Sequence, residues 1–436
     1  MYIKKNETVF PRRVEKKGGY SLLLILTIVY LTWLYVLPLI HLLFSDRPFL
    51  IHFGRFLIPL FIILTATRKS EISFILRPRS VAYLGISILT ALLSNLLSSG
   101  INLADISFRI YEIITCWAVY SLFMYIFLSE KRATSILMIM AILATLNSIF
   151  GIWGAVSGKS IFGVTYEDVG FGTMGFDPAT GRAGGLRGEN YVGIWNVPAL
   201  VMGLIIVKRQ GWLLRCVGAL FILLSLSSIV VSLSRTSVIC GGVALIGYFY
   251  YSFTEIRSFL NRILFTFLLS LVIIGCLQFS IILILRQTTF FTPHVRYEME
   301  RRWTMSEILE NERKHIWLRY LTIDLDNPFF GKGSGYIANK VLTGESVPHN
   351  SLIDIFVEHG VVALLIYIFP IAKGIRSFFI LGKKKHKGED IGKTLSLVTL
   401  AMFVALLFLS NPFLKIFWAM LGALDGRIQA IKKLRF

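Results

Sequence analysis

Long runs of apolar residues alternate along this chain with short polar segments, and the pattern predicts a helical membrane protein. A helix that crosses the hydrocarbon core of a bilayer needs about 20 mostly apolar residues. Twelve stretches meet or approach that length, and the last of them is short. Their predicted boundaries are 20–43, 49–67, 81–97, 106–128, 134–157, 191–207, 211–230, 236–253, 263–285, 351–372, 394–410 and 412–424.

Two polar segments are too long to be simple connections between spans. They divide the chain into 1–157 with five spans, a Gly-rich loop at 158–190, 191–285 with four spans, a large loop at 286–350, and 351–436 with the last three spans. Apolar residues near helical spacing predict a helix over 297–323, which Asn327-Pro328 ends. The fold class expected is therefore all-α: a polytopic membrane protein of about twelve transmembrane helices with a large helical extracytoplasmic loop.

Composition agrees with this picture, because 55% of the residues are hydrophobic and only 16% are charged. The formal net charge of +20 would suggest nucleic acid in a soluble protein. When the N-terminus is placed inside and the spans alternate, 28 Lys and Arg face inward and 14 outward, nine of the latter in 286–350. Long loops translocate largely regardless of charge, so the nine in 286–350 do not argue against this orientation. The excess of basic residues is explained by the inward-facing segments of a membrane protein and needs no nucleic acid. Both termini are expected in the cytoplasm, with no nucleic-acid partner.

His349 is the candidate base. It lies in Val347-Pro348-His349-Asn350-Ser351, where the long outer loop meets the next span. An imidazole at the outer membrane surface can accept a proton near neutral pH. The alternative is a helix-start motif in which Pro348, Asn350 and Ser351 form the turn and cap and His349 is incidental.

Arginines in outward segments are candidate anion ligands. Arg235 lies in the short hairpin Ser232–Ser237, against the positive-inside bias. Arg187 lies in the Gly-rich loop, and Arg302 and Arg313 share a face if the helix of the long loop is continuous. The alternatives are snorkelling to headgroups for Arg235, a flexible cover for the Gly-rich loop, and a solvated helix with pairs such as Glu298 and Arg302.

Two apparent motifs carry little weight. Gly331-Lys332-Gly333-Ser334 lacks the upstream glycine and the Ser or Thr directly after the lysine that a phosphate loop requires. Asp324-Leu325-Asp326 precedes Asn327-Pro328 and is more typical of a turn than of a divalent-metal site. No metal and no cofactor are expected.

The region from Arg313 to Gly360 contains Arg-Lys-His-Ile-Trp, then Asn327-Pro-Phe-Phe-Gly-Lys-Gly, and then Pro348-His-Asn-Ser. Gly360 follows directly after the nine residues Ser351–His359. With Ser-Leu-Ser-Arg235-Thr-Ser upstream, it resembles the O-antigen ligase and Wzy-type polymerase superfamily of bacterial surface-polysaccharide proteins. The motif-bearing resemblance covers roughly 184–370, and Ala363 departs from the Gly or Thr that the family often has there.

The resemblance implies a glycosyltransferase at the outer leaflet of the bacterial inner membrane, with an undecaprenyl-diphosphate-linked saccharide as donor and a glycan as acceptor. It implies that His349 is the base and that Arg235 and Arg313 hold the diphosphate, with Arg187 and Arg302 as second choices. Arginine suits this role because its planar fork binds phosphate oxygens bidentately. Membrane lipid and a chain-length regulator are further candidate partners.

Several functions stay open at this stage. The leading one is a polymerase that joins lipid-linked repeat units into O-antigen, another lipopolysaccharide component or exopolysaccharide. A ligase that passes the finished glycan to lipid A-core shares the donor chemistry. A lipid-linked oligosaccharide flippase or other transporter is disfavoured because the sequence shows no repeat and few in-span cations, namely Arg55, Arg109 and Lys415. A purely structural membrane protein is the fourth reading.

The predicted topology can be tested by cysteine labelling in intact cells, with the outer membrane permeabilised where there is one. Single cysteines at Thr173 and Ser306 are expected to react with an impermeant thiol reagent, because both loops are placed outside. A cysteine at Lys384 is expected to stay unlabelled. Labelling at Lys384 would overturn the orientation.

Overall fold

The computed structural model describes residues 22–43, 57–61, 64, 78–97, 102–157, 175–177, 182–186, 190–208, 211–232, 234–253, 261, 264, 297, 312–323, 327–342, 346–382 and 390–433. The predicted spans at 49–67 and 263–285 lie mostly outside these residues, and so do Arg187, Arg302 and the Asp324–Asp326 pair.

Seven predicted spans in the first 253 residues appear as helices close to their expected bounds. They are α1 (Leu22–Leu43), α4 (Pro78–Leu96), α5 (Leu103–Ile126), α6 (Glu130–Ser157), α8 (Val192–Ile206), α9 (Trp212–Val231) and α10 (Arg235–Ser252). Side-chain caps explain two of the starts: Asn102 accepts from the Ala104 N–H before α5, and Ser234 accepts from the Ser237 N–H before α10.

Two of the three C-terminal spans, α16 (Ser351–Gly382) and α18 (Lys415–Lys433), are longer than the apolar runs suggested. The third is α17 (Asp390–Leu406). The last span was expected at 412–424 with a cytoplasmic tail after it, and that boundary is wrong because the helix continues. Asp425 pairs with Lys373, and Arg427 donates to Glu130 at 2.7 Å, so polar residues in the second half of α18 are buried through specific partners.

Two glycines bring α18 against α5. A Cβ added at Gly422 would lie 2.1 Å from the carbonyl oxygen of Tyr120, and one at Gly426 would lie 2.1 Å from that of Met124. Both glycines and both carbonyls are four residues apart, which is one turn along each helix. Small residues at this spacing let membrane helices approach backbone to backbone, where dispersion replaces the hydrophobic effect as the attraction.

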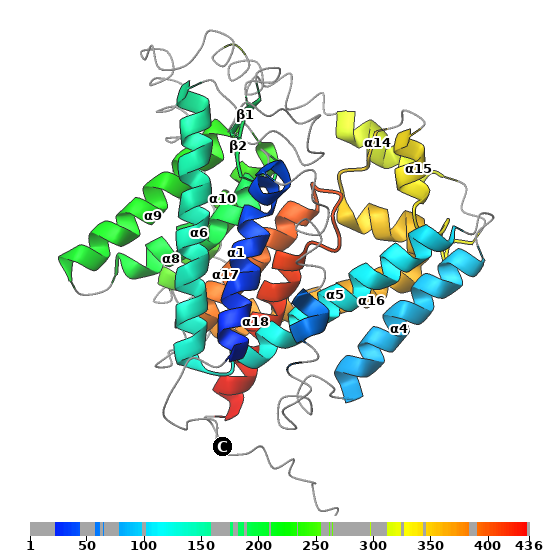
Figure 1. Cartoon of the computed structure of the whole chain (residues 1–436), viewed down its shortest axis with the longest axis horizontal. Helices are drawn as coiled ribbons and strands as arrows, with labels where there is room; N and C mark the ends of the chain where they lie inside the picture. Colours follow the sequence, from blue (N-terminus) through cyan, green and yellow to red (C-terminus); the bar gives the residue numbers. More distant parts are fainter. Residues whose placement is uncertain are drawn as a thin grey trace, which may run out of the picture.

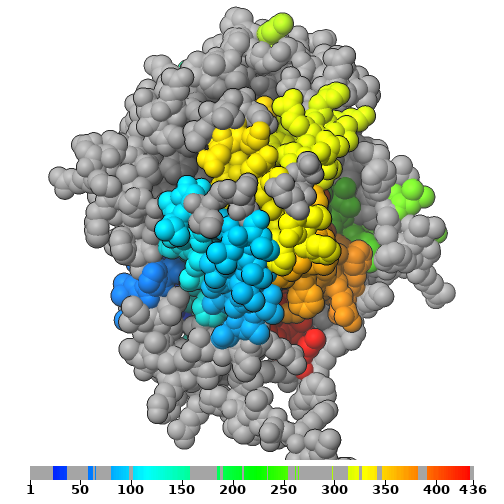
Figure 2. All heavy atoms as spheres, turned by 90° about the vertical axis from the view of Figure 1, so that its right-hand side faces the viewer, coloured from blue at the N-terminus to red at the C-terminus, as the bar shows by residue number. Residues whose placement is uncertain are grey.

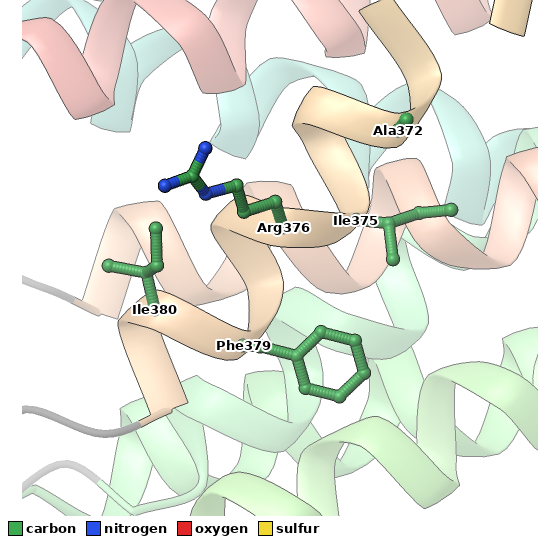
Figure 3. A pocket seen from close by; sticks show the side chains of 5 residues that line it. All are labelled: Ala372, Ile375, Arg376, Phe379 and Ile380. Atoms are coloured by element: carbon green, nitrogen blue, oxygen red, sulfur yellow. The ribbon is translucent and has the colours of Figure 1, made fainter. Parts of the chain in front are cut away.

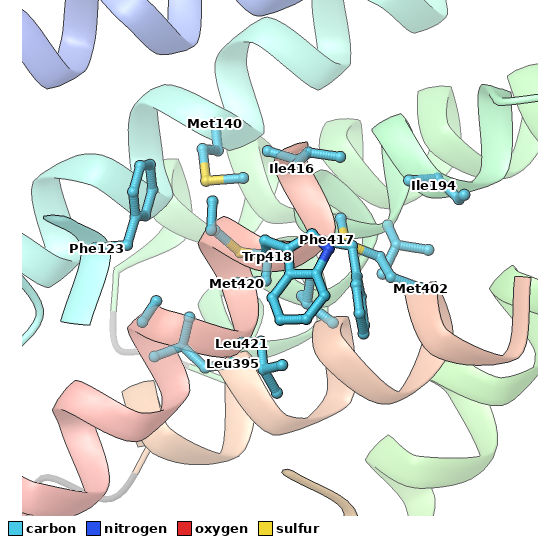
Figure 4. Close-up of a cluster of buried hydrophobic side chains, with 14 of the residues drawn as sticks. Phe123, Met140, Ile194, Leu395, Met402, Ile416, Phe417, Trp418, Met420 and Leu421 are labelled. Carbon is cyan, nitrogen blue, oxygen red and sulfur yellow. The ribbon is translucent and has the colours of Figure 1, made fainter. Parts of the chain in front are cut away.

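The core lies where α5, α6, α8, α17 and α18 meet, as Figure 4 shows. Its fully buried side chains include Phe123, Met140, Ile194, Met402 and Phe417. Large apolar side chains also cover the outside of the helices, in contrast to a soluble protein. The exposed ones include Ile86, Leu103, Leu223, Leu365 and Phe369.

Within the described residues, four helices are long and apolar enough to cross a membrane. They are Leu103–Ile126, Glu130–Ser157, Trp212–Val231 and Ser351–Leu381. Shorter apolar helices cover Leu23–Val36, Ser80–Leu96 and Val192–Ile206. Together with the exposed apolar faces, these helices make the chain a multi-pass membrane protein. The count of about twelve spans still rests on the sequence pattern.

The all-α expectation missed one short β hairpin, which lies in the Gly-rich loop. Strand β1 (Gly175–Asp177) pairs antiparallel with β2 (Arg182–Gly185), with Phe176 opposite Ala183. Gly185 has a φ of +61°, and a Cβ there would lie 2.6 Å from the Asn147 carbonyl oxygen. The next residue, Leu186, donates its N–H to Asn147 Oδ1 at 2.8 Å. The loop is therefore docked on α6 at this point.

In its described residues the long loop contains the short helices α14 (Glu312–Leu321) and α15 (Tyr336–Leu342). The helix expected over 297–323 ends near the predicted position, and most of its first half lies outside the described residues. Figure 1 shows α14, α15, β1 and β2 at the end of the molecule opposite the C-terminus. Both long loops thus contribute to one end of the helical bundle.

Helix α16 is broken at Gly360, whose φ and ψ are 75° and −175°. Residues 327–333 of the long loop lie against the break and bond the freed backbone groups. Val361 N–H donates to the Pro328 carbonyl at 3.0 Å, and Gly333 N–H donates to the Glu358 carbonyl at 2.8 Å. The Asn-Pro-x-x-Gly-x-Gly motif and Gly360 are therefore two halves of one backbone junction.

We expect Gly360→Ala to lower the thermal midpoint of unfolding in detergent, with a loss of about 1–3 kcal/mol or more. A Cβ at Gly360 would lie 2.2 Å from the Phe329 carbonyl oxygen, and the backbone conformation there is nearly restricted to glycine. Gly85→Ala in α4 is the matched control, because nothing lies within 4 Å of its added Cβ. Equal midpoints for the two variants would contradict the junction.

Candidate active site

Arg235 is the first residue of α10, and the serines around it organise the hairpin. Ser232 Oγ donates to the Ile229 carbonyl at 2.7 Å, and Ser234 Oγ accepts from the Ser237 N–H at 3.3 Å. Ser237 Oγ accepts from the Gly193 N–H at 2.9 Å and ties the start of α10 to α8. The partly buried Arg235 side chain thus starts from a fixed backbone at the positive end of a helix dipole.

Helix α14 is fastened to the segment that contains His349 by two hydrogen bonds. Trp317 Nε1 donates to the Pro348 carbonyl at 2.6 Å, and the Tyr320 hydroxyl donates to the Ser346 carbonyl at 3.1 Å. Tyr320 also packs with Ile353 and Val357 of α16 in a small hydrophobic cluster. This contact sets the position of α14 relative to the start of α16.

Arg313 lies on the same face of α14 as these anchoring residues. Trp317 and Tyr320 follow it at i+4 and i+7, and such positions stack along one side of a helix. A fully solvated helix would explain Arg313 poorly, because the apolar Leu309 and Trp317 are four residues before and after it in the sequence. Its partial burial in the structure agrees with that observation.

The charges of the three principal candidates influence one another. Burial lowers the pKa of the Arg313 guanidinium, and the charge of Arg235 lowers it further. Burial also lowers the pKa of His349 below 6.5, with the Arg313 charge as the second cause. Arg235, Arg313 and His349 come from three separated segments, and the fold brings them within electrostatic range. The lowered pKa leaves His349 neutral at pH 7, as a base must be.

His349 has an unusual backbone. Its φ is +52°, and among the described residues it is the sole non-glycine with a positive φ. The neighbouring residues hold this conformation: Asn350 Oδ1 accepts from the Leu352 and Ile353 N–H groups at 2.9 and 3.3 Å, and Ser351 Oγ donates to the Leu409 carbonyl at 2.5 Å. The capping reading thus accounts for Asn350 and Ser351. It does not account for strain at His349, which typically marks functional sites.

The sequence analysis missed a partly buried ionic cluster that joins α5, α16 and α18. Arg109 of α5 donates to Glu112 Oε2 at 2.9 Å and pairs with Glu358 of α16. Lys415 of α18 lies 3.6 Å from Glu112 Oε1. The statement that in-span charges are few considered cations alone, and it is wrong once their acidic partners are included. The signal was available in the i,i+4 carboxylates Asp354 and Glu358 within an apolar span.

This cluster also holds the long loop. Glu358 Oε1 accepts from the Ile337 N–H at 3.3 Å, at the start of α15. Asn95 of α4 donates to Ser334 Oγ at 2.9 Å and accepts from the Ser334 N–H at 2.8 Å. Glu358 and Asn95 therefore tie the long loop to α16 and α4.

Comparison with known families bears on residues 198–368, which match the family model described as O-antigen ligase (Wzy_C). The matched segment is less than half of the chain, and it is similar to the Wzy_C O-antigen ligase domain. The resemblance seen in the motifs is thereby confirmed, and Arg235, Arg313 and His349 all lie inside the matched segment. Wzy_C enzymes are of the O-antigen ligase and polymerase type and act on lipid-linked polysaccharides. Comparisons with curated proteins and with solved structures found no match.

Among the described residues, no three His, Cys, Asp or Glu side chains are grouped as a metal site would need. The site presents two guanidinium groups, a helix N-terminus and a neutral imidazole. Such a set can bind an oxyanion and remove a proton from a hydroxyl group. Arg187 and Arg302, the second-choice ligands, lie outside the described residues.

We expect Trp317→Phe to reduce glycan transfer about tenfold or more while leaving the thermal midpoint nearly unchanged. The change removes the hydrogen bond to Pro348 that positions His349 and keeps most of the apolar contact. Trp153→Phe, on the exposed face of α6, is the control and should transfer normally. Full activity in Trp317→Phe would mean that α14 does not position the base.

Proposed function

We propose that the protein is a glycosyltransferase that joins undecaprenyl-diphosphate-linked repeat units into a surface polysaccharide at the outer leaflet of the inner membrane. The observation that carries the proposal is the convergence of Arg235, Arg313 and His349 from three segments. The family supplies the class of lipid-linked donor. The choice of polymerase over ligase is the more specific part of the proposal.

In the proposed reaction an acceptor sugar hydroxyl attacks the anomeric carbon of the donor. His349 takes the hydroxyl proton as the new glycosidic bond forms. The bond between the anomeric carbon and the diphosphate oxygen breaks, and undecaprenyl diphosphate leaves. Arg235 and Arg313 stabilise the negative charge that grows on the diphosphate, so no metal ion is required.

The ligase reading stays the second candidate, because the matched family model is described as O-antigen ligase. It would use the same donor groups with lipid A-core as the acceptor. The flippase reading is less favoured, since the sequence shows no internal repeat of the kind that many transporters have.

For the catalytic groups, we expect His349→Ala to abolish transfer with normal protein level and membrane insertion. Arg235→Ala and Arg313→Ala should each lose most activity, and the Lys variants should recover only part of it, because lysine keeps the charge without the planar fork. Chelators should have little effect. Tolerance of alanine at any of the three positions would remove that residue from the mechanism.

The pH profile provides a separate readout of the same groups. With the pKa of His349 lowered, transfer should persist below pH 6.5 and decline only as the pH falls through that lowered value. Arg313→Gln removes one cause of the shift, so the acid limb of its residual activity should move to higher pH. An unmoved limb would indicate that Arg313 does not act on His349.

Deleting the gene separates the polymerase from the ligase. Without a polymerase, the ligase still transfers single units, and a lipopolysaccharide gel should show core plus one repeat in place of a ladder. A bare core with accumulated lipid-linked polymer would establish the ligase reading. An unaltered ladder with a missing capsule or secreted polysaccharide would assign the same chemistry to another glycan.

A further inference from the structure

A cavity of about 570 Å³ lies between α4, α5, α16 and α18, away from Arg235, Arg313 and His349. Its walls run from Thr90 and His359 at one end to Lys373 and Lys432 at the other. Neither the family match nor the proposed transfer reaction assigns a role to it.

The length of the cavity corresponds to one leaflet. Along α5 its lining extends from Ile113 to Met124, and the eleven steps of 1.5 Å between these residues correspond to about 16 Å. The hydrocarbon core of a bilayer is about 30 Å thick. An extended hydrocarbon chain that belongs to one leaflet therefore fits the cavity from end to end.

The walls suit hydrocarbon better than water. Most lining residues are apolar, and wall hydroxyls are bonded within the protein: Tyr83 donates to the Ile366 carbonyl at 3.2 Å and Thr90 to the Ile86 carbonyl at 2.8 Å. At the deep end, His359 Nε2 lies 3.9 Å from Glu358 Oε2, next to the ionic cluster.

The other end has a cationic mouth. Lys373 pairs there with Asp425, and Lys432 is exposed on the last turn of α18. Figure 3 shows Arg376 projecting from α16 close to the apolar Phe379 and Ile380. An exposed Arg among exposed apolar side chains is typical of snorkelling at the membrane surface. The mouth thus lies at headgroup level, on the side that the Lys and Arg distribution assigns to the cytoplasm.

The cavity is reached from the membrane. Phe369 lines it and is 67% exposed, and Leu365, one turn away on α16, is 63% exposed. Figure 2 shows the face of the molecule on which α4 and α16 lie next to each other. Exposed apolar residues on a multi-pass protein face lipid, so the occupant enters laterally from the bilayer.

We propose that this cavity binds one acyl chain of an anionic glycerophospholipid from the cytoplasmic leaflet, with the phosphate at Lys432 and Lys373. The depth of the cavity fits a single-leaflet chain, its walls fit hydrocarbon, and its mouth fits a negative headgroup. Anionic lipids are concentrated in the cytoplasmic leaflet, and basic pockets between membrane helices recognise them.

The test is lipid retention by the full-length protein purified in mild detergent, with extracted phospholipids measured by mass spectrometry. Wild type is expected to retain phosphatidylglycerol at about one per chain and to discriminate against phosphatidylcholine. Lys432→Glu should lower the retained anionic lipid several-fold. Lys208→Glu is the control, since this exposed lysine is placed on the same membrane face and lies outside the cavity.

A second variant separates the chain from the headgroup. Ala363→Phe places a ring in the cavity and should lower retention of every phospholipid, with an unchanged elution profile as the folding check. Trp117 and Trp418 line the cavity, so phosphatidylglycerol with brominated chains in phosphatidylcholine vesicles should quench wild type more than Ala363→Phe. Equal retention and quenching in both variants and wild type, or extraction of a polyprenyl lipid in place of phospholipid, would overturn the proposal. Neither outcome depends on transfer activity, so the proposed function is tested separately.

Discussion

The structure depends on a backbone junction inside the membrane domain, where α16 breaks at Gly360. Lipid offers no hydrogen bonds, so a broken helix is stable there only if another segment bonds the freed groups. Residues 327–333 provide those bonds, and two glycines permit the close approach of the two segments. A Cβ at Gly331 would lie 2.7 Å from the backbone nitrogen of His359, and one at Gly360 would lie 2.2 Å from the Phe329 carbonyl oxygen. The outer loop is therefore anchored to the helical bundle at residues 327–333. This anchor fixes the positions of α14 and α15, which precede and follow it in the loop.

Fixed positions allow like charges to gather. Burial lowers the pKa of Arg313 and of His349, and the charges of Arg235 and Arg313, respectively, lower these pKa values further. A flexible loop would reduce such repulsion by moving the charges apart. Here Trp317, Tyr320 and the serine caps hold the groups in place. A site whose donor groups are held together before a diphosphate binds is electrostatically preorganised, which is the main requirement for stabilising a charged leaving group.

The sequence predicted what depends on apolar length and on local chemistry. The helices of the described spans and the resemblance of residues 198–368 to the family followed from it. Helix ends were less accurate, because α18 continues through Asp425 and Arg427 by pairing with Lys373 and Glu130 on distant helices. The Glu358–Arg109 pair was missed for the same reason, since its partners are 249 residues apart. The β hairpin depends on its docking to Asn147, which local propensity does not contain.

The ionic cluster bears on the choice between enzyme and transporter. Arg109, Glu112, Glu358 and Lys415 join α5, α16 and α18 near one end of the bundle, and Asn95 joins α4 to the outer loop. Alternating access would have to separate these helices, and breaking a buried ion pair costs about 3–5 kcal/mol. Two backbone contacts of α18 glycines with α5 restrict the same interface further. A bundle locked in this way suits a stationary site that works on a substrate delivered within the membrane, as a transferase does.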